Sequence, residues 1–222
     1  MEREIFITSD GSSSIFIPEL KETYHSKHGA IQEAYHVFIN NGLDQFADHA
    51  IINILEIGFG TGLNCFITYL ESKRRNLKVK YDGVEAYPLE AEDISQLNYV
   101  QELKATNESK IFGKLHSISW DKNYHINDDF YLIKRKQYFK EIDDKNGFDL
   151  IYFDAFGANV QPELWSVEIF KKMYNSLKNK GVLVTYSAKG SVRRAMQQVG
   201  FKVERLPGPP GKREMLRGIK NG

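Results

Sequence analysis

Short apolar runs alternate with helix-like patterns along most of this chain. From residue 51 onward, β-rich runs of three to seven residues predict strands, and their near-continuous apolar character indicates burial on both faces. These runs span residues 51–57, 80–85, 131–133, 148–154, 181–187, 201–206 and 214–219. Helical segments separate several of them, which predicts an α/β fold: a doubly wound, mostly parallel, seven-stranded sheet with right-handed crossovers.

Two helices are predicted in the C-terminal part of the chain. Residues 162–177 carry Pro near the first turn and an apolar face. The next helix is expected to begin with Ser191 as its N-cap and to stop at Gly200. Its apolar stripe comprises Val192, Ala195, Met196 and Val199. Arg193 and Arg194 are therefore expected to face away from the core.

The first 50 residues precede the alternating pattern. Residues 4–8 and 14–18 are β-rich and flank the turn signal Asp10-Gly11-Ser12, which predicts a hairpin, and residues 30–41 predict a helix. Neither repeats nor a Pro/Gly/Ser-rich linker divide the chain. We therefore expect one domain over residues 1–222, with an N-terminal extension at 1–50 and a Rossmann-like core at 51–222.

Composition narrows the class of protein. Of the 222 residues, 41% are hydrophobic and 27% charged, which argues against long disorder, and no apolar run is long enough to span a membrane. The N-terminus lacks an apolar signal core, so we expect a cytoplasmic protein. The single cysteine, Cys65, excludes an internal disulfide framework and a thiolate zinc cluster, and the scattered histidines predict no metal site.

Charge is distributed unevenly along the chain. Residues 171–222 hold 13 Lys or Arg and 2 Glu, whereas residues 1–170 hold 17 basic and 27 acidic residues. A basic block of this kind indicates an anionic partner such as nucleic acid. A solvated surface on which charges happen to segregate is the alternative interpretation.

A glycine-rich turn follows the first core strand. Gly58, Gly60 and Gly62 stand at alternate positions between a strand and a helix, where glycine accepts a positive φ and lets a ligand approach the backbone. The spacing G-x-G-x-G favours S-adenosylmethionine over a dinucleotide, whose pattern is G-x-G-x-x-G. Glu56 and Asn64, on either side of the glycines, join them as candidate cofactor-binding residues.

Two acids end later strands of the predicted sheet. Glu85 ends the second core strand, where a carboxylate can accept hydrogen bonds from both hydroxyls of a ribose. Asp154 ends the run 148–154 and should emerge beside the same crevice, as a candidate cofactor-binding and catalytic residue that orients an amine nucleophile. A cap for the following turn is the simpler interpretation of Asp154.

Several segments together resemble the MnmC-type methyltransferases, the methyltransferase part of a bifunctional tRNA 5-methylaminomethyl-2-thiouridine biosynthesis protein. The resemblance covers most of the chain, and its most specific parts are the two C-terminal basic motifs. It is carried by the glycine turn, Glu85, Phe153–Phe156, Ser187–Arg194, Gly200-Phe201 and Lys212–Met215, and upstream by Tyr24, Gly29, Glu33 and Val37-Phe38.

The resemblance implies N-methylation, dependent on S-adenosylmethionine, of 5-aminomethyl-(2-thio)uridine at the tRNA wobble position. Tyr24 and Phe156 are then expected to stack on the extruded base. Arg193, Arg194, Lys212 and Arg213 are expected to contact tRNA phosphates. This set completes the candidate substrate-binding residues.

Two departures from the family pattern shape further expectations. The chain ends at Gly222, before any flavin-dependent oxidase domain, so we expect a stand-alone methyltransferase without FAD that acts after a separate oxidase or a carboxymethylaminomethyl-pathway enzyme. Lys134 aligns where the family has an acid facing the adenine amino group. Three other functions stay open: aminopropyl transfer as in polyamine synthases, a non-catalytic RNA-binding module on this scaffold, and methylation of a small molecule or a protein.

Overall fold

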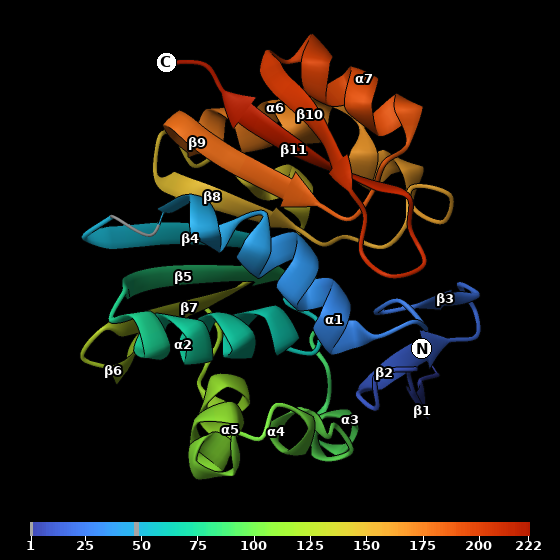
Figure 1. Ribbon diagram of the computed structural model, residues 1–222, viewed down its shortest axis with the longest axis vertical. Coiled ribbons are helices and arrows are strands. Elements are labelled where there is room, and N and C mark those ends of the chain that lie inside the picture. Colours follow the sequence, from blue (N-terminus) through green and yellow to red (C-terminus); the bar gives the residue numbers. More distant parts are fainter. Residues whose placement is uncertain (1, 47–48) are drawn as a thin grey trace.

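The computed structural model describes residues 2–46 and 49–222, and its centre is a mostly parallel sheet with helices on both faces (Figure 1). The order of the main sheet is β10-β11-β9-β8-β4-β5-β7-β6. In that order the strands are β10 Phe201–Pro207, β11 Glu214–Lys220, β9 Leu177–Thr185, β8 Phe148–Phe153, β4 Ile51–Ile57, β5 Lys78–Glu85, β7 Phe130–Lys136 and β6 Asn123–Asn127. The predicted fold class is confirmed.

The described sheet has eight strands where the sequence predicted seven. The additional strand is β6, which pairs antiparallel with β7 at one edge. Its sequence, Asn-Tyr-His-Ile-Asn, is short and has a single aliphatic residue among mostly polar ones, so the pattern did not indicate a strand. The strands β9, β8, β4, β5 and β7 are parallel neighbours, whereas β11 and β10 return antiparallel at the other edge.

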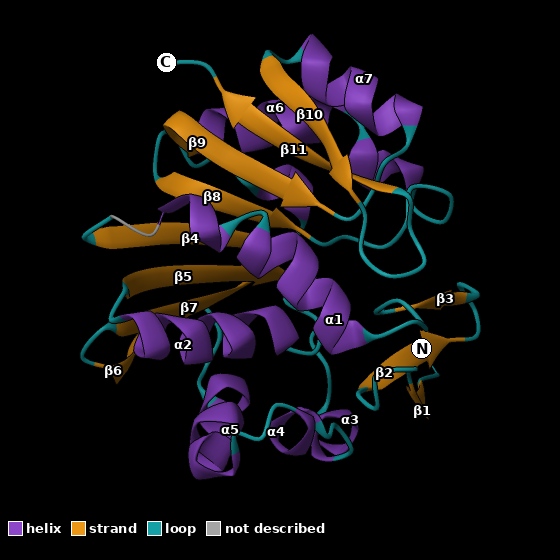
Figure 2. Ribbon diagram, viewed as in Figure 1, coloured by secondary structure: helices purple, strands orange, loops and turns teal. Residues whose placement is uncertain are grey.

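Helices cover the two faces of the sheet because successive residues of each strand point to opposite sides. In β4, Ile52 and Ile54 join the core beneath α2 (Leu63–Arg75) and α5 (Ser109–Ser117). Leu55 and Ile57 join the core beneath α6 and α7 on the other face. The remaining helices are α1 Ala30–Ala34, α3 Ala91–Ser95, α4 Tyr99–Glu102, α6 Val167–Ser176 and α7 Gly190–Gln198 (Figure 2).

Three helix boundaries differ from the sequence prediction. The first predicted helix is α-helical only over Ala30–Ala34 and continues as a wider π-helical turn to Asn40. The second begins as a 3-10 turn, Pro162–Trp165, and the Ser166 side chain then caps α6 by accepting from Ile169 N–H. In the third, α7 starts at Gly190, so Lys189 rather than Ser191 is the N-cap residue.

The N-terminal hairpin is confirmed and is extended by a third strand. β1 (Glu4–Ile7), β2 (Ser13–Ile17) and β3 (Glu22–Thr23) form a small antiparallel sheet beside the carboxyl ends of the parallel strands (Figure 1). The Asn98 side chain joins this sheet to α4, accepting from Ser13 N–H at 2.7 Å and donating to Gly11 O at 2.8 Å. The extension therefore forms one wall of the space above the main sheet.

The carboxyl ends of β4 and β8 lie level with each other, since Ile57 pairs with Phe153. Asp154 N–H continues the ladder by donating to Ile57 O at 2.9 Å, and Gly58 N–H donates to Val84 O of β5 at 3.0 Å. Three strand ends therefore meet at one edge of the sheet. Here the connections that follow β4 and β8 leave in opposite directions, and doubly wound sheets bind ligands at such a position. In the described part of the chain, no helix has the length and apolar character needed to cross a bilayer.

Candidate active site

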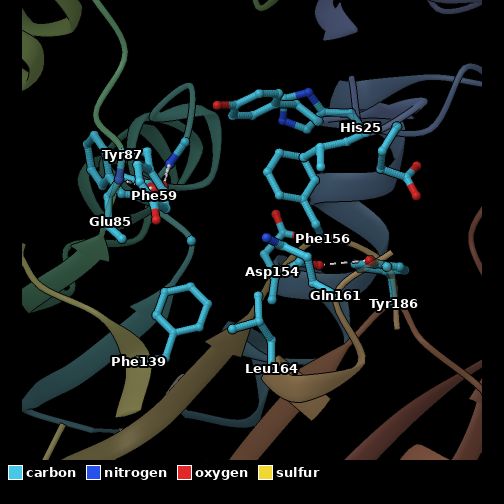
Figure 3. A pocket seen from close by; sticks show the side chains of 18 of the residues that line it. His25, Phe59, Glu85, Tyr87, Phe139, Asp154, Phe156, Gln161, Leu164 and Tyr186 are labelled. Carbon is cyan, nitrogen blue, oxygen red and sulfur yellow. Dashed lines mark hydrogen bonds between the residues drawn. The ribbon is translucent and has the colours of Figure 1, made fainter. Parts of the chain in front are cut away.

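A cavity of about 850 Å³ opens at this edge of the sheet (Figure 3). Its size lies in the upper part of the range of about 300–1,000 Å³ that small-molecule and cofactor sites occupy. Segments distant in sequence line it: the N-terminal sheet, α1, the turn after β4, the ends of β5 and β8, the residues after β7 and the β10–β11 loop.

The glycine turn forms the floor of the cavity. Gly58, Gly60 and Gly62 all have positive φ, at 91°, 48° and 71°. A Cβ on Gly58 would lie 2.6 Å from the Asp154 carbonyl oxygen, and one on Gly60 would lie 3.1 Å from the Tyr24 ring. Gly58 and Gly60 line the cavity, whereas Gly62 packs against the His116 ring outside it. The turn therefore requires glycine for its backbone conformation and its packing, and two of the three glycines face the cavity.

Glu85 stands at the end of β5 and lines the cavity. One carboxylate oxygen accepts from Gly60 N–H at 3.0 Å and the other from Tyr87 N–H at 2.9 Å. These two bonds fix the carboxylate against the glycine turn and leave lone pairs on both oxygens. Vicinal hydroxyl groups are suitable donors for such a carboxylate, so the site fits a ribose.

Glu56 lies behind the cavity wall and not in it. Its side chain is fully buried, and both of its oxygens lack a hydrogen-bond partner among the described residues. Burial raises the pKa of Glu56 well above its usual range, and the neighbouring polar groups of Tyr81 and Asn64 oppose this only in part. Burial therefore favours the neutral form of Glu56. The sequence predicted that Glu56 contacts the cofactor. In the structure Glu56 does not line the cavity, and it lies next to Asn64, which does.

Asp154 follows β8 and lines the cavity next to the glycine turn. Its carboxylate accepts from Asn64 Nδ2 at 2.8 Å. Desolvation and, to a smaller extent, the Glu33 charge raise the pKa of Asp154 to about 7, although Asn64 and Lys212 act to lower it. A carboxyl group in this environment exchanges a proton near neutral pH, a property that acid–base and charge-stabilising residues need. The prediction that Asp154 emerges at the crevice is confirmed.

Aromatic side chains surround Asp154. Tyr24 and Phe156 meet edge to face with centroids 5.0 Å apart, and both line the cavity, as Figure 3 shows for Phe156. Phe139 and Leu164 add apolar surface below Asp154 in the same view. Together these groups leave a polar centre between apolar walls, which suits a planar ring that carries a polar substituent.

Three cavity residues went unrecognised as site residues in the sequence: Glu33 of α1, Tyr186 after β9, and His25. Burial lowers the pKa of His25 to about 4, so its imidazole is neutral at pH 7. Glu33 forms an ion pair with Lys212. Tyr186 could have been found because it follows the end of β9 as Asp154 follows β8. Nothing in the sequence joins Glu33 to Lys212, which is 179 positions away.

Lys134 does not line the cavity. It lies inside β7, is 1% exposed, and donates from Nζ to His116 O at 2.6 Å beneath the Trp120 ring. Desolvation lowers the pKa of Lys134 to about 8. Since β7 runs on to Lys136, the wall beyond it is made by Tyr138–Lys140. Lys134, which aligns where the family has an acid, is therefore not placed to contact a ligand in the cavity.

The four predicted phosphate-binding residues separate into two groups. Arg194 and Arg213 are exposed and Arg193 is half-buried, and none of the three forms an ion pair with another described residue. Lys212 instead reaches into the main cavity. A smaller cavity of about 400 Å³ adjoins it and is lined by residues 186–189 and 212–214.

Within residues 2–46 and 49–222 no group of three or more His, Cys, Asp or Glu side chains could hold a metal ion. The site instead combines a glycine turn with positive φ, a ribose-type carboxylate and a strand-end Asp between aromatic walls. On this fold, these features define a Rossmann-like methyltransferase.

Comparison with known proteins places the chain more closely. Residues 96–221 match a family described as S-adenosyl-L-methionine-dependent methyltransferase, and the chain belongs to this family. The chain is also similar to proteins named tRNA 5-methylaminomethyl-2-thiouridine biosynthesis bifunctional protein MnmC. The relative from Cupriavidus necator is 30% identical over 90% of this chain and 32% of its own length, and that from Polaromonas naphthalenivorans 28% over 98% and 36%. The chain thus spans about a third of the length of these curated relatives.

Solved structures agree with this placement. The chain is similar to MNMC2 from Aquifex aeolicus, with a TM-score of 0.78 and 25% identity over 98% of this chain and 69% of that one. A spermidine synthase from Thermotoga maritima has a TM-score of 0.53 and 14% identity, over 94% of this chain and 68% of that one. The second likeness concerns the fold alone.

Proposed function

We propose that this protein transfers a methyl group from S-adenosylmethionine to the amine of 5-aminomethyl-(2-thio)uridine at the wobble position of tRNA. The observation that carries the proposal is the position of Asp154 in one continuous cavity, between the glycine turn with Glu85 on one side and aromatic walls on the other. The names of the similar proteins support the choice of substrate. We further propose that residues 1–222 act as one methyltransferase domain in the cytoplasm, where tRNA is found.

S-adenosylmethionine fits the part of the cavity beside β4 and β5. Gly58 and Gly60 would lie against it, and Glu85 would accept hydrogen bonds from its ribose hydroxyls. Asn64 completes this side, whereas Glu56 and Gly62 shape the turn from behind. When bound, the cofactor supplies a sulfonium-linked methyl group that is open to in-line displacement.

Asp154 is then the residue that holds the attacking amine. Its main task is positioning, since a neutral amine about 3–3.5 Å from the methyl carbon already gains most of the available rate enhancement. The nitrogen gains positive charge as the N–C bond forms, and the Asp154 carboxylate stabilises that charge. A pKa of about 7 also lets Asp154 accept a proton from an amine that enters as ammonium.

Tyr24 and Phe156 are the proposed walls for the extruded uracil ring. Their edge-to-face arrangement leaves aromatic surface toward Asp154, where the ring that carries the aminomethyl group would lie. Arg193, Arg194 and Arg213 are proposed to contact tRNA phosphates outside the cavity. The smaller cavity is lined by Arg213 and shares Tyr186 and Lys212 with the main cavity.

Methyl displacement is not a redox step, so the proposed reaction requires no flavin. The aminomethyl group must be supplied by another activity, a flavin-dependent oxidase or an enzyme of the carboxymethylaminomethyl pathway. A purely RNA-binding role is the main alternative. It predicts tRNA binding without turnover of the cofactor.

The test is methylation of tRNA that lacks only the final wobble methyl group. The protein is incubated with labelled S-adenosylmethionine and this tRNA, and the RNA is digested to nucleosides for mass spectrometry. We expect label in 5-methylaminomethyl-(2-thio)uridine, and none with tRNA that already carries the methyl group. Label in another nucleoside, or cofactor binding without transfer, would refute the proposal.

A further inference from the structure

Lys212 occupies a corner of the cavity that is built from acidic and aromatic groups. Its Nζ lies 2.5 Å from Glu33 Oε1 and 3.8 Å from the centroid of the Tyr186 ring. The other Glu33 oxygen accepts from Ser26 N–H at 2.9 Å, and the Tyr186 hydroxyl donates to Ala155 O at 2.8 Å. Tyr186 and Glu85 lie on opposite sides of Asp154 in Figure 3, so this corner is distinct from the ribose end.

The β10–β11 loop fixes Lys212 in this position. Gly208 N–H donates to Arg213 O at 3.1 Å and closes the loop, and His36 Nε2 contacts Pro207 O at 2.8 Å. Gly211 has a φ of 83°, and a Cβ there would lie 2.0 Å from the His28 ring. The loop is thus packed on the N-terminal extension and directs the Lys212 side chain inward.

The groups around the Lys212 ammonium are those that recognise an alkylammonium ion. A buried carboxylate supplies a charge-assisted hydrogen bond, and an aromatic face supplies a cation–π contact. Glu33 is only 7% exposed, so its charge is poorly screened by water. Asp154 lines the same cavity as a second carboxylate. Without the lysine, this corner would be an acidic site for an amine beside the amine site of the proposed reaction.

We propose that Lys212 determines amine specificity: its ammonium fills a second ammonium subsite formed by Glu33 and Tyr186, and so restricts the cavity to substrates with one amine. The proposal rests on the proposed function only for the identity of the first amine at Asp154. The class of ligand that Lys212 excludes is a diamine or polyamine cation.

The surrounding charges are consistent with this role. Other titratable groups beside the corner are Glu22, whose charge acts on Tyr186, and His25, on which Glu33 and Lys212 both act. His25 is neutral at pH 7, because burial lowers its pKa to about 4. Lys212 is therefore the counter-ion of Glu33, and its removal leaves Glu33 and Glu22 to attract cations toward Asp154.

The test compares binding of 1,4-diaminobutane and n-butylamine to the full chain by calorimetry at pH 8. In Lys212→Ala we expect diamine affinity to rise about ten-fold or more over wild type, the value of one charge-assisted hydrogen bond. The gain should be larger for the diamine than for the monoamine. Arg213→Ala, which removes the same charge from the neighbouring exposed position, should show no gain.

The double variant Lys212→Ala with Glu33→Gln should lose the gain, because the carboxylate that binds the second ammonium is gone. Unchanged diamine affinity in Lys212→Ala, an equal gain in Arg213→Ala, or a gain that persists in the double variant would each overturn the proposal. Calorimetry requires neither tRNA nor methyl transfer, so its outcome is independent of the proposed function.

Lys212→Ala leaves Glu33 without its ion-pair partner and can cost stability. If it does not fold, Lys212→Gln removes the charge but keeps a donor for Glu33. The same preference of diamine over monoamine is then expected, read as a larger increase in melting temperature with 1,4-diaminobutane than with n-butylamine. Equal increases for the two amines in this variant would refute the subsite.

Discussion

Proton exchange at Asp154 near neutral pH provides the sharpest test of its role. Desolvation holds the pKa of Asp154 at about 7. A group with that pKa is roughly one tenth ionised at pH 6 and roughly nine tenths ionised at pH 8. If the carboxylate is the active form, its contribution to kcat/KM for tRNA should rise about ten-fold between these two pH values.

The comparison with Asp154→Asn isolates this contribution. The neutral fraction of the substrate amine also rises with pH, but it does so for both proteins, so the ratio of wild-type to variant kcat/KM cancels it. We expect that ratio to be about ten or more at pH 8, where the carboxylate stabilises the charge on nitrogen, and to fall toward pH 6. A ratio that stays constant between pH 6 and pH 8 would refute the reasoning.

Substitution of two neighbouring residues should shift the pKa of Asp154 in opposite directions. The Glu33 charge raises the pKa of Asp154, so Glu33→Gln should move the inflection to lower pH. The Asn64 hydrogen bond lowers that pKa, so Asn64→Ala should move it to higher pH. Opposite shifts from two residues in the same cavity cannot arise from a general loss of stability.

Folding stability offers a control that needs no substrate. Because the folded pKa of Asp154 is raised above its value of 3.8 in the unfolded chain, its contribution to stability is complete below pH 3.8. That contribution is lost as pH rises through about 7. The side chain introduced by Asp154→Asn stays neutral at every pH. The melting temperature of this variant minus that of wild type should therefore increase as the pH is raised from 5 to 8. A difference that does not change with pH would argue that Asp154 is ionised throughout.

Three further predictions concern the cofactor and the tRNA. Glu85→Ala leaves two ribose hydroxyls unpaired and should weaken cofactor binding by about 1–3 kcal/mol, and unchanged affinity by calorimetry would remove Glu85 from the site. Glu56→Gln preserves a neutral buried side chain and should bind the cofactor within about two-fold of wild type, whereas loss of binding would indicate an ionised Glu56 in direct contact. Arg193→Glu and Arg194→Glu should weaken tRNA binding and reduce the slope of log affinity on log salt by about 0.7–0.9 per lost contact, and an unchanged slope would identify a solvated surface.

The ends of parallel strands made the centre of the site predictable from sequence. A glycine turn after β4, an acid at the end of β5 and an acid after β8 all lie at the same edge, because parallel strands in one sheet end on the same side. Glu85 and Asp154 therefore lie in one cavity, as the spacing indicated. Glu56 does not reach the cavity because strand side chains alternate in direction, and Glu56 lies on the same buried face of β4 as Ile52 and Ile54.

The second part of the site depends on contacts that no local pattern encodes. Glu33 lies on a helix whose apolar periodicity predicts burial, yet its partner is in a loop 179 positions later. Lys134 was singled out only by its alignment with the acid of the family pattern, whereas the structure buries it inside β7, which extends to Lys136 beyond the weak pattern at 131–133. Long-range pairing and strand length were the properties that sequence reasoning could not supply here.

Lys212 and Arg213 are adjacent in the sequence and were both predicted to contact phosphates. The geometry of the loop places them in different environments. One side chain enters the cavity and pairs with Glu33, while the next faces solvent, because the backbone runs into the extended conformation of β11 at Glu214. The basic block is therefore not one uniform surface. Removal of Arg213 should change the salt dependence of tRNA binding, whereas removal of Lys212 should change which amines the cavity accepts. Arg213 would then contribute to attraction of the tRNA, and Lys212 to the choice of the amine.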